Sequence, residues 1–253
     1  MSSTVGLSPI HLPDPDEFAR TFMTLHRSVL DGADVVEVFS MLAESCVRLL
    51  PVKAGGVLAL DSLGFLQVIG ASDLSVDLID LCQVQNLEGP SLRCCRSGEL
   101  VADTMLSPQG PWPRFSELAT SLGYRAVYAV PLRSLGVVIG SLSLFGTEEM
   151  PADRLVAAKA LADAATLALL QADPREDTMV VARQVHLAVE SHNTVEQARG
   201  MIAQRFGMTD DGAIEQLRRA AAQLGLPLVD VARATVHRDA LHPAVSLLQQ
   251  PLG

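Results

Sequence analysis

Residues 194–202 read Thr-Val-Glu-Gln-Ala-Arg-Gly-Met-Ile, and this stretch decides the fold of the last third of the chain. Val195, Ala198 and Ile202, followed by Phe206, recur at the spacing of a single helix face. They therefore predict a helix with one inward side. No other stretch of the chain has an order and spacing of residues that is as specific for one kind of structure.

Outward from this stretch, the residues that follow also favour helices. Helices are expected at residues 176–206, 210–224 and 228–236. Gly207 and Gly225 stand where the first two would end, as glycine commonly does at a helix C-terminus. Three helices in about 60 residues form a small bundle that is marginal alone. We therefore expect this bundle to pack on a partner chain or on the first domain.

A proline marks the boundary of this bundle. Asp173-Pro174 is the only strong break after residue 151, because proline interrupts a helix and restricts its predecessor. The predicted organisation has four parts: a flexible arm at 1–13, a first domain at 14–173, a helical domain at 175–240 and a tail at 241–253.

The first domain is predicted to be α+β. Strands are expected at residues 55–60, 65–69, 100–102, 124–132 and 137–145. Helices are expected between and around them, at 14–29, 34–50, 74–84, 90–97, 115–122 and 153–172. The sequence thus predicts an antiparallel sheet with flanking helices, and helices 74–97 closing one side over a pocket for a small ligand.

Two helix starts carry recognisable caps. Asp14, with Glu17 three residues on, predicts a capping box, and Asp34 with Glu37 predicts another. The helix at 153–172 has a small, flat face that suits close packing, either on the sheet or across a dimer. The residues of this face are Leu155, Ala158, Ala162, Ala165 and Leu169.

Composition and charge exclude several classes of protein. With 49% hydrophobic residues the chain is not disordered as a whole. Its net charge of −10 argues against non-specific binding to nucleic acid or membrane. Residues 175–253 hold eight Arg, no Lys and nine Asp or Glu, so most of the negative charge lies in the first part.

The sequence gives no support for catalysis. It lacks a G-x-S-x-G nucleophile motif, a P-loop, a G-x-G-x-x-G loop and an H-E-x-x-H zinc motif. The six histidines are scattered, and the four cysteines fit no metal spacing. We therefore predict neither an enzyme nor a cofactor or metal. No apolar run reaches a membrane span and no signal peptide is visible, so a cytoplasmic protein is expected.

Residues 35–170 resemble the GAF domains of bacterial, actinobacterial-type GAF–ANTAR regulators. The matching motifs are Glu-Gly-Pro at 88–90, Gly-Glu-Leu-Val at 98–101, Trp-Pro-Arg-Phe at 112–115, Gly-Tyr-Arg-Ala-Val at 123–127 and Leu-Ser-Leu at 142–144. The resemblance implies a sensor that dimerises and can bind a small molecule. Candidate pocket residues are Gly89, Ser91, Cys94, Trp112 and Tyr128.

Each pocket candidate has a plainer interpretation. Trp112, beside Pro113, is typical of a hydrophobic plug as well as of a ligand platform. Ser91 stands where members of the family often have cysteine, which argues against thiol-based sensing there. The Cys94-Cys95 pair leaves a redox role open, whereas buried structural thiols are the simpler interpretation.

Residues 180–238 resemble ANTAR domains, whose "IEQAKG-IL" core matches residues 194–202. Further matches follow at the family's spacing, at Ala213, 217–219 and 228–232. The resemblance implies binding to RNA stem-loops that compete with a transcription terminator, and a homodimer that presents two such domains. Together with the first resemblance, it predicts an N-terminal GAF domain followed by a small three-helix ANTAR bundle.

The predicted RNA-binding residues are Gln197, Arg199, Gly200, Arg218 and Arg219. Arg199 is expected to project away from the inward face, and arginine can bind phosphate or stack on loop bases. Gly200 costs a helix about 1 kcal/mol relative to alanine, so a neighbouring helix or RNA is expected close to its backbone. The alternative is that the arginines pair with Glu196, Glu215 and Asp211 on a solvated surface.

Three positions depart from the family's pattern. His192, Gly225 and Pro227 stand where relatives often carry basic or amide side chains, so polar contacts to RNA are lost. A dimeric protein-interaction or signalling module with degenerate RNA binding is therefore the alternative function.

Overall fold

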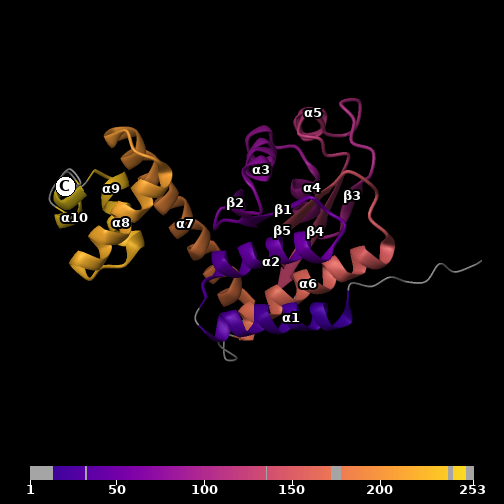
Figure 1. The fold of residues 1–253 in the computed structure, drawn as a ribbon, viewed down its shortest axis with the longest axis horizontal. Helices are drawn as coiled ribbons and strands as arrows, with labels where there is room; N and C mark the ends of the chain where they lie inside the picture. Colours follow the sequence, from indigo (N-terminus) through magenta and orange to yellow (C-terminus); the bar gives the residue numbers. More distant parts are fainter. Residues whose placement is uncertain (1–13, 32, 135, 172–177, 239–241, 249–253) are drawn as a thin grey trace, which may run out of the picture. The chain divides into compact units, whose positions relative to one another are not determined.

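The structure is a computed structural model that describes residues 14–31, 33–134, 136–171, 178–238 and 242–248 (Figure 1). The chain divides into two compact units, Met1–His186 and Leu187–Gly253, which are treated separately below. This division falls inside helix α7 (Thr178–Phe206). The predicted boundary at residues 173–174 and the predicted arm at 1–13 lie outside the described residues.

The first unit is a five-stranded antiparallel sheet covered by helices, so the predicted fold class is confirmed. The strands are β1 (Ala54–Leu60), β2 (Leu66–Ala71), β3 (Val101–Asp103), β4 (Ala126–Ser134) and β5 (Val137–Gly146). Their order across the sheet is β2-β1-β5-β4-β3. The helices are α1 (Pro15–Leu30), α2 (Val35–Leu49), α3 (Leu74–Asn86), α4 (Pro90–Ser97), α5 (Pro113–Ser121) and α6 (Ala152–Gln171).

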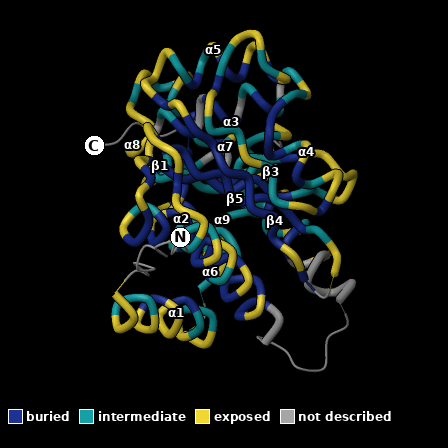
Figure 2. The backbone as a smooth tube through the Cα atoms, turned by 90° about the vertical axis from the view of Figure 1, so that its right-hand side faces the viewer, coloured by how far each residue is buried: buried dark blue, intermediate teal, exposed yellow. Residues whose placement is uncertain are grey.

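The helices form a layer on each side of the sheet. α2 and α6 contact β1, β2 and β4, and α1 packs on α2 and α6. α3 and α4 contact strands from the other side, with α5 packed against α3 (Figure 1). Because both faces are covered, the central strands β1, β4 and β5 are buried along most of their length (Figure 2).

Only one of the two predicted capping boxes forms. At α2, the Asp34 side chain accepts from the Glu37 backbone N–H, and the Glu37 side chain accepts from the Asp34 backbone N–H. At α1, Asp14 accepts from the Asp16 backbone N–H. Glu17 instead pairs with Arg48 of α2 at 3.6 Å, so the reciprocal half of the predicted box is wrong.

The small face of α6 packs on the sheet. Ala158, Ala162 and Ala165 are fully buried in the single chain, and α6 contacts β4. Of the two alternatives that the sequence left open for this face, the sheet is therefore the one observed. Any contact between two copies must use a different surface.

The second unit is a helical bundle. After α7 come α8 (Asp210–Leu224), α9 (Leu228–Val236) and α10 (Pro243–Leu248). The short helix α10 was not expected, because its residues were assigned to the tail. Ala244 and Leu248 are nevertheless buried in the bundle core, and the Leu248 carbonyl accepts from Gln216 Nε2 at 3.3 Å.

Among the described residues, no helix combines the length and the apolar character that a membrane crossing requires.

Candidate functional site

The core of the second unit fixes which side chains of α7 can reach a partner. Ala198 and Ile202 are buried against α8 and α9, while Val195 and Phe206 are partly buried at the edge of the same cluster. The predicted inward face of α7 is thus confirmed. α8 then starts at the Thr209 cap, whose side chain accepts from the Gly212 backbone N–H at 3.2 Å.

Gln197 and Gly200 lie on the outward side of α7, and both are exposed. A helix turns by about 100° per residue, so Gly200 points roughly opposite to the buried Ala198. A Cβ built on Gly200 would meet nothing within 4 Å. The expectation of a neighbouring helix against this glycine is therefore wrong for the described part of the chain.

Arg199 lies at the edge of the buried face rather than opposite it. Its side chain is 34% exposed, because Ala198 and Ile202 on either side of it point inward. Its guanidinium bonds to the Glu196 carboxylate at 2.5 Å. The ordered pair is half-covered by the helix, so an RNA phosphate would have to compete with Glu196 for this arginine.

Arg218 and Arg219 follow the buried Leu217 on α8, and both are exposed. Arg219 pairs with Glu215 at 3.3 Å, one turn earlier. Arg218 makes no ion pair with any residue in the described ranges, including Asp211. The alternative of arginines paired with carboxylates on the helix surface is therefore observed for Arg199 and Arg219. It is not observed for Arg218.

Two of the three residues that depart from the family's pattern shape the turn between α8 and α9. Gly225 caps α8 with φ of 64°, in the left-handed region that glycine tolerates. Pro227 is the N-cap position of α9. Both residues thus shape the turn of the chain itself.

In the first unit, three of the five predicted pocket residues belong to α4 or to its N-terminal cap. Gly89, with φ of 143°, precedes α4 and lies against the Gln83 side chain. Ser91 is fully buried, and its hydroxyl lies 2.6 Å from that of Ser143 on β5. Cys94 is fully buried on the next turn.

Tyr128 is not part of this group. It pairs in register with Leu144, which faces α2, whereas the neighbouring Ser143 faces α4. Successive residues of a strand alternate between faces, so Tyr128 lies on the opposite side of the sheet from Ser91. Its hydroxyl accepts from the Met150 backbone N–H at 2.6 Å.

Trp112 packs into the core, as expected if it is a hydrophobic plug. Its ring meets Phe115 edge-on, with ring centroids 6.4 Å apart, and only 8% of the residue is exposed. It also lines a surface cleft of about 310 Å³ beside Arg93, Ser97 and Asp103. Trp112 thus belongs to the core cluster around Phe115.

Sequence reasoning missed the most polar part of this core. Gln83 donates to Asp80 at 2.7 Å and accepts from the Ser91 backbone N–H at 3.0 Å, and both side chains are buried. A signal existed, because Asp80 and Gln83 fall on the same helical stripe as the buried Val76 and Ile79. Ser141 and Ser143 gave a similar signal by alternating with leucines along β5.

Three thiols are held in their neutral form: Cys46 and Cys94 are buried, and Cys95 is half-buried. Burial raises the pKa of Cys46 and of Cys95 to about 12, and that of Cys94 to about 11. All four cysteines are free. Because the thiolate is the reactive form, this environment does not favour redox chemistry at the Cys94-Cys95 pair.

Within the described residues, no three His, Cys, Asp or Glu side chains are grouped so that they could hold a metal ion.

Comparison with known families identifies the helices that carry the predicted RNA-binding residues. Residues 183–236 match the ANTAR domain family. The match covers most of the described α7, all of α8 and all of α9, and it includes all five residues predicted from the sequence to bind RNA. The ANTAR domain ends at the last residue of α9, so α10 lies beyond the family's match.

Solved structures similar to this chain include sensor domains. A GAF domain of a phosphoenolpyruvate-protein phosphotransferase from Acinetobacter is 13% identical, over 63% of this chain and 96% of that one, with a TM-score of 0.49. The corresponding domain from Coxiella burnetii is 16% identical, over 64% and 99%, with a TM-score of 0.47.

A domain of a two-component sensor histidine kinase from Sinorhizobium meliloti 1021 is 14% identical, over 53% of this chain and 90% of that one, with a TM-score of 0.45. At such identities and scores, these likenesses carry no argument about a site. No curated protein matches the chain.

Proposed function

We propose that this protein is a signal-responsive, RNA-binding regulator of transcription antitermination. The observation that carries the proposal is the ANTAR match at residues 183–236 together with an outward surface on the same helices. Gln197, Gly200 and Arg218 are exposed there. The ANTAR family implies RNA binding. On this surface Gln197 supplies a hydrogen-bond donor, Gly200 leaves the helix backbone uncovered, and Arg218 supplies a positive charge.

The charges of this surface favour a selective interaction over a purely electrostatic one. Arg218 has no carboxylate partner in the described structure, so it can meet a phosphate or a loop base directly. Arg199 and Arg219 would first leave Glu196 and Glu215. The exposed Arg219–Glu215 pair costs about 0–1 kcal/mol to break, so an RNA phosphate can displace Glu215.

The first unit is proposed as a GAF-type sensor. Its support is the sequence resemblance at residues 35–170 and the polar group of Asp80, Gln83, Ser91 and Ser143 buried under α3 and α4. A small molecule with hydrogen-bonding groups would bind here by taking over the position of the Gln83 amide. Gly89, Ser91 and Cys94 then remain proposed contacts, with Trp112 and Tyr128 outside this group.

The mechanism requires two copies of the chain. A cue in the sensor unit would change the geometry of a homodimer, and this change would bring two ANTAR domains into register with two hairpin loops. RNA held in this way no longer forms the terminator, so transcription continues. Each element of this mechanism is a separate hypothesis, and RNA recognition is the first to test.

The test measures binding of the purified protein to two tandem hairpins with hexanucleotide loops, against a control with scrambled loops. Arg218→Ala should weaken selective binding by about tenfold or more, since a lost charge-assisted contact is worth about 1.5–3 kcal/mol. Arg233→Ala is the matched control, because Arg233 is also exposed but pairs with Asp230 on α9. Equal affinities for the wild type and Arg218→Ala would refute the assigned surface.

A second candidate function is a protein-interaction module that no longer binds RNA. The neutralised Arg199 and Arg219, and the loss of polar side chains at Gly225 and Pro227, favour it. A fall of RNA affinity with salt that becomes shallower in Arg218→Ala would speak against it, because phosphate contacts release counterions. Absence of any RNA affinity in a folded protein would establish it over the first proposal.

A further inference from the structure

A short helix at the end of the described chain covers one side of the second unit. α10 packs against α8 and α9 (Figure 1). The ANTAR match ends at residue 236, whereas α10 begins at Pro243. The helix is therefore an addition to the matched domain, and its role has to be inferred from its own contacts.

α10 uses one face and one carbonyl for these contacts. Ala244 and Leu248 stand four residues apart, so they lie on the same face of the helix, and they are 0% and 4% exposed. Both belong to the buried cluster of the second unit. The carbonyl of Leu248 accepts from Gln216 Nε2 on α8 at 3.3 Å. The surface of α8 and α9 that α10 covers, with Gln216 as its polar group, is called the α10 site below.

Gln216 is only half satisfied at this site. The residue is 7% exposed, and its Oε1 has no hydrogen-bond partner among the described residues. A buried amide oxygen without a donor has lost its water and gained nothing in return, which opposes docking of the helix that covers it. α10 thus complements the apolar part of the site and leaves its polar group incomplete.

α10 is also short. It has six residues, and helices shorter than about 12–15 residues are marginal in water, so α10 depends on α8 and α9 for its helical form. Ordering its backbone costs conformational entropy at every residue, and the unpartnered oxygen of Gln216 adds to this cost. The burial of Ala244 and Leu248 acts in the opposite direction. Such a balance favours a helix that docks weakly.

We propose that α10 is a displaceable internal ligand, and that the α10 site is a docking site for a short helix of a partner protein. The partner helix carries a small residue and a leucine four positions apart, as α10 does with Ala244 and Leu248. It differs from α10 because it also supplies a hydrogen-bond donor to Gln216 Oε1. A helix that satisfies the whole amide displaces α10, and recognition follows the helix-in-groove mode.

The chemistry of the site favours a protein helix over RNA. Leu217 and Ala220 of α8 belong to the same buried cluster as Leu248, so the site offers mainly apolar area. Gln216 and Arg218 are two residues apart, which is about 200° around a helix, so they lie on roughly opposite sides of α8. The docking site is therefore independent of the proposed RNA contact at Arg218.

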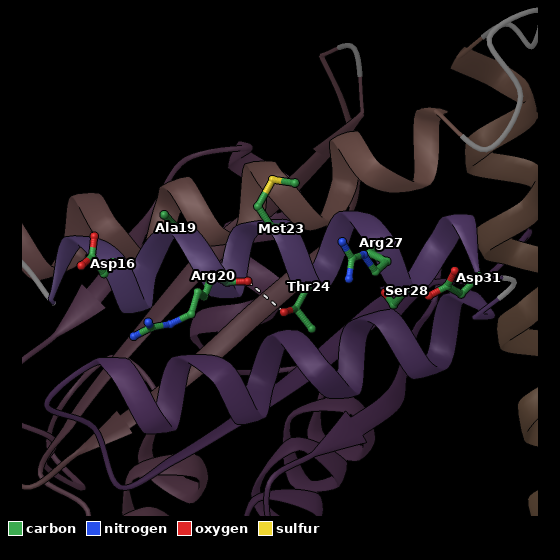
Figure 3. A pocket seen from close by; sticks show the side chains of 8 residues that line it. All are labelled: Asp16, Ala19, Arg20, Met23, Thr24, Arg27, Ser28 and Asp31. Atoms are coloured by element: carbon green, nitrogen blue, oxygen red, sulfur yellow. Dashed lines mark hydrogen bonds between the residues drawn. The ribbon is translucent and has the colours of Figure 1, made fainter.

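The depression along α1 lacks the feature that makes the α10 site informative. It measures about 720 Å³, and its lining side chains, from Asp16 to Asp31, all project from one helix (Figure 3). Its lining does not indicate what would cover it. At the α10 site the covering helix is part of the structure, so the chemistry that the site accepts is known.

The first test measures backbone hydrogen exchange in the full-length protein. Because α10 opens without the rest of the bundle, the amides of residues 247 and 248 should exchange at least about tenfold faster than those in the buried turns of α8. Gln216→Glu should accelerate exchange in α10 further, since a carboxylate cannot donate to the Leu248 carbonyl. Gln223→Glu adds the same charge at an exposed position of α8 and is the matched control.

Equal protection of α10 and α8 in the wild type would show that α10 is a fixed part of the core, and this result would overturn the proposal. Exchange in α10 that responds equally to Gln216→Glu and Gln223→Glu would remove the amide from the site.

The second test uses a labelled synthetic peptide with the sequence of residues 239–253 as the probe. Leu248→Asp should release α10, because a charge does not enter the apolar cluster, and should leave the site free. We expect this variant to bind the probe at least about tenfold more tightly than the wild type, whose tethered α10 competes at a high effective concentration. Adding Gln216→Glu should abolish the gain, and adding Gln223→Glu should not. The titration extends to millimolar probe, because a weakly held helix also binds weakly in trans.

Circular dichroism checks that each variant is folded. A folded Leu248→Asp variant that binds the probe no better than the wild type, or a gain that survives Gln216→Glu, would overturn the docking site. Loss of the fold in Leu248→Asp would show that the bundle requires α10, which would overturn displacement. Hairpin affinity of the same samples separates a failure of this site from a failure of the proposed RNA binding, because Leu248→Asp leaves Arg218 untouched.

Discussion

Gln83 connects the helices α3 and α4 of the first unit through a single amide. It donates to Asp80 on its own helix and accepts from the Ser91 backbone at the start of α4. A Cβ added to Gly89 would overlap its side chain. This one side chain therefore connects α3 to the start of α4.

Replacing Gln83 by leucine should destabilise the protein. The volume is nearly kept, but the Ser91 N–H and the Asp80 carboxyl each lose a buried partner, at a cost of about 1–3 kcal/mol per group. Denaturant unfolding measures the loss. Gln109→Leu, on an exposed loop, is the control and should change the stability by no more than about 0.5 kcal/mol. Equal effects of the two changes would show that the buried network contributes little.

The cysteines give a prediction that depends on pH. The pKa values of Cys46, Cys94 and Cys95 in the folded state, about 11 to 12, exceed the ordinary value of 9.0. Folding therefore favours the protonated thiol. This contribution is present below pH 9 and is lost as the pH rises towards 12, because the unfolded chain ionises first.

Cys46, Cys94 and Cys95 should thus react slowly with an alkylating reagent at pH 8 and rapidly in denaturant. Peptide mapping after a short pulse measures each site. Fast labelling of the 94–95 pair in the folded protein would contradict the buried, neutral state and would reopen a redox role for it.

The helices α7 and α8 show what can be predicted at the scale of an element. The inward positions of α7 followed from spacing alone, because burial repeats with the period of the helix. The ion pairs did not follow, since Arg218 and Arg219 are neighbours in sequence and only Arg219 finds a carboxylate one turn away. Side-chain pairing depends on distances of a few ångströms, which spacing does not resolve.

The sheet shows the same limit. Strand positions were predicted closely, yet Tyr128 was grouped with Ser91 although they lie on opposite faces. Both faces of β4 are covered by helices, so nearly all of its side chains are buried and no polar side marks the faces. The face of a residue in such a strand is fixed by register, which only the folded sheet provides.

Gly200 yields the prediction that belongs to α7 itself. Because a Cβ there meets open space, Gly200→Ala should stabilise the helix by about 0.5–1 kcal/mol. If RNA approaches this backbone, the same methyl group should weaken RNA binding. Thermal unfolding and hairpin affinity, measured on one sample, give both values. Increased stability with unchanged affinity would remove Gly200 from the RNA-binding surface.

At the scale of the whole molecule, the net charge is distributed unevenly between residues 1–174 and the ANTAR domain. Residues 1–174 carry nine of the ten net negative charges, so this part of the chain is expected to repel nucleic acid. The ANTAR domain is nearly neutral and must use few, specific contacts. RNA affinity should therefore fall only moderately with salt, and Arg218→Ala should lower the slope of log affinity against log salt by about 1, whereas Arg233→Ala leaves it unchanged.

The most direct test of the account is the binding of the intact protein to tandem hexanucleotide-loop hairpins and to their loop-scrambled counterparts at near-physiological salt. The account predicts selective binding that depends on Arg218 and persists in Arg233→Ala. Equal binding of both RNAs, or none, by a folded and dimeric protein would contradict it and leave a module that binds protein alone.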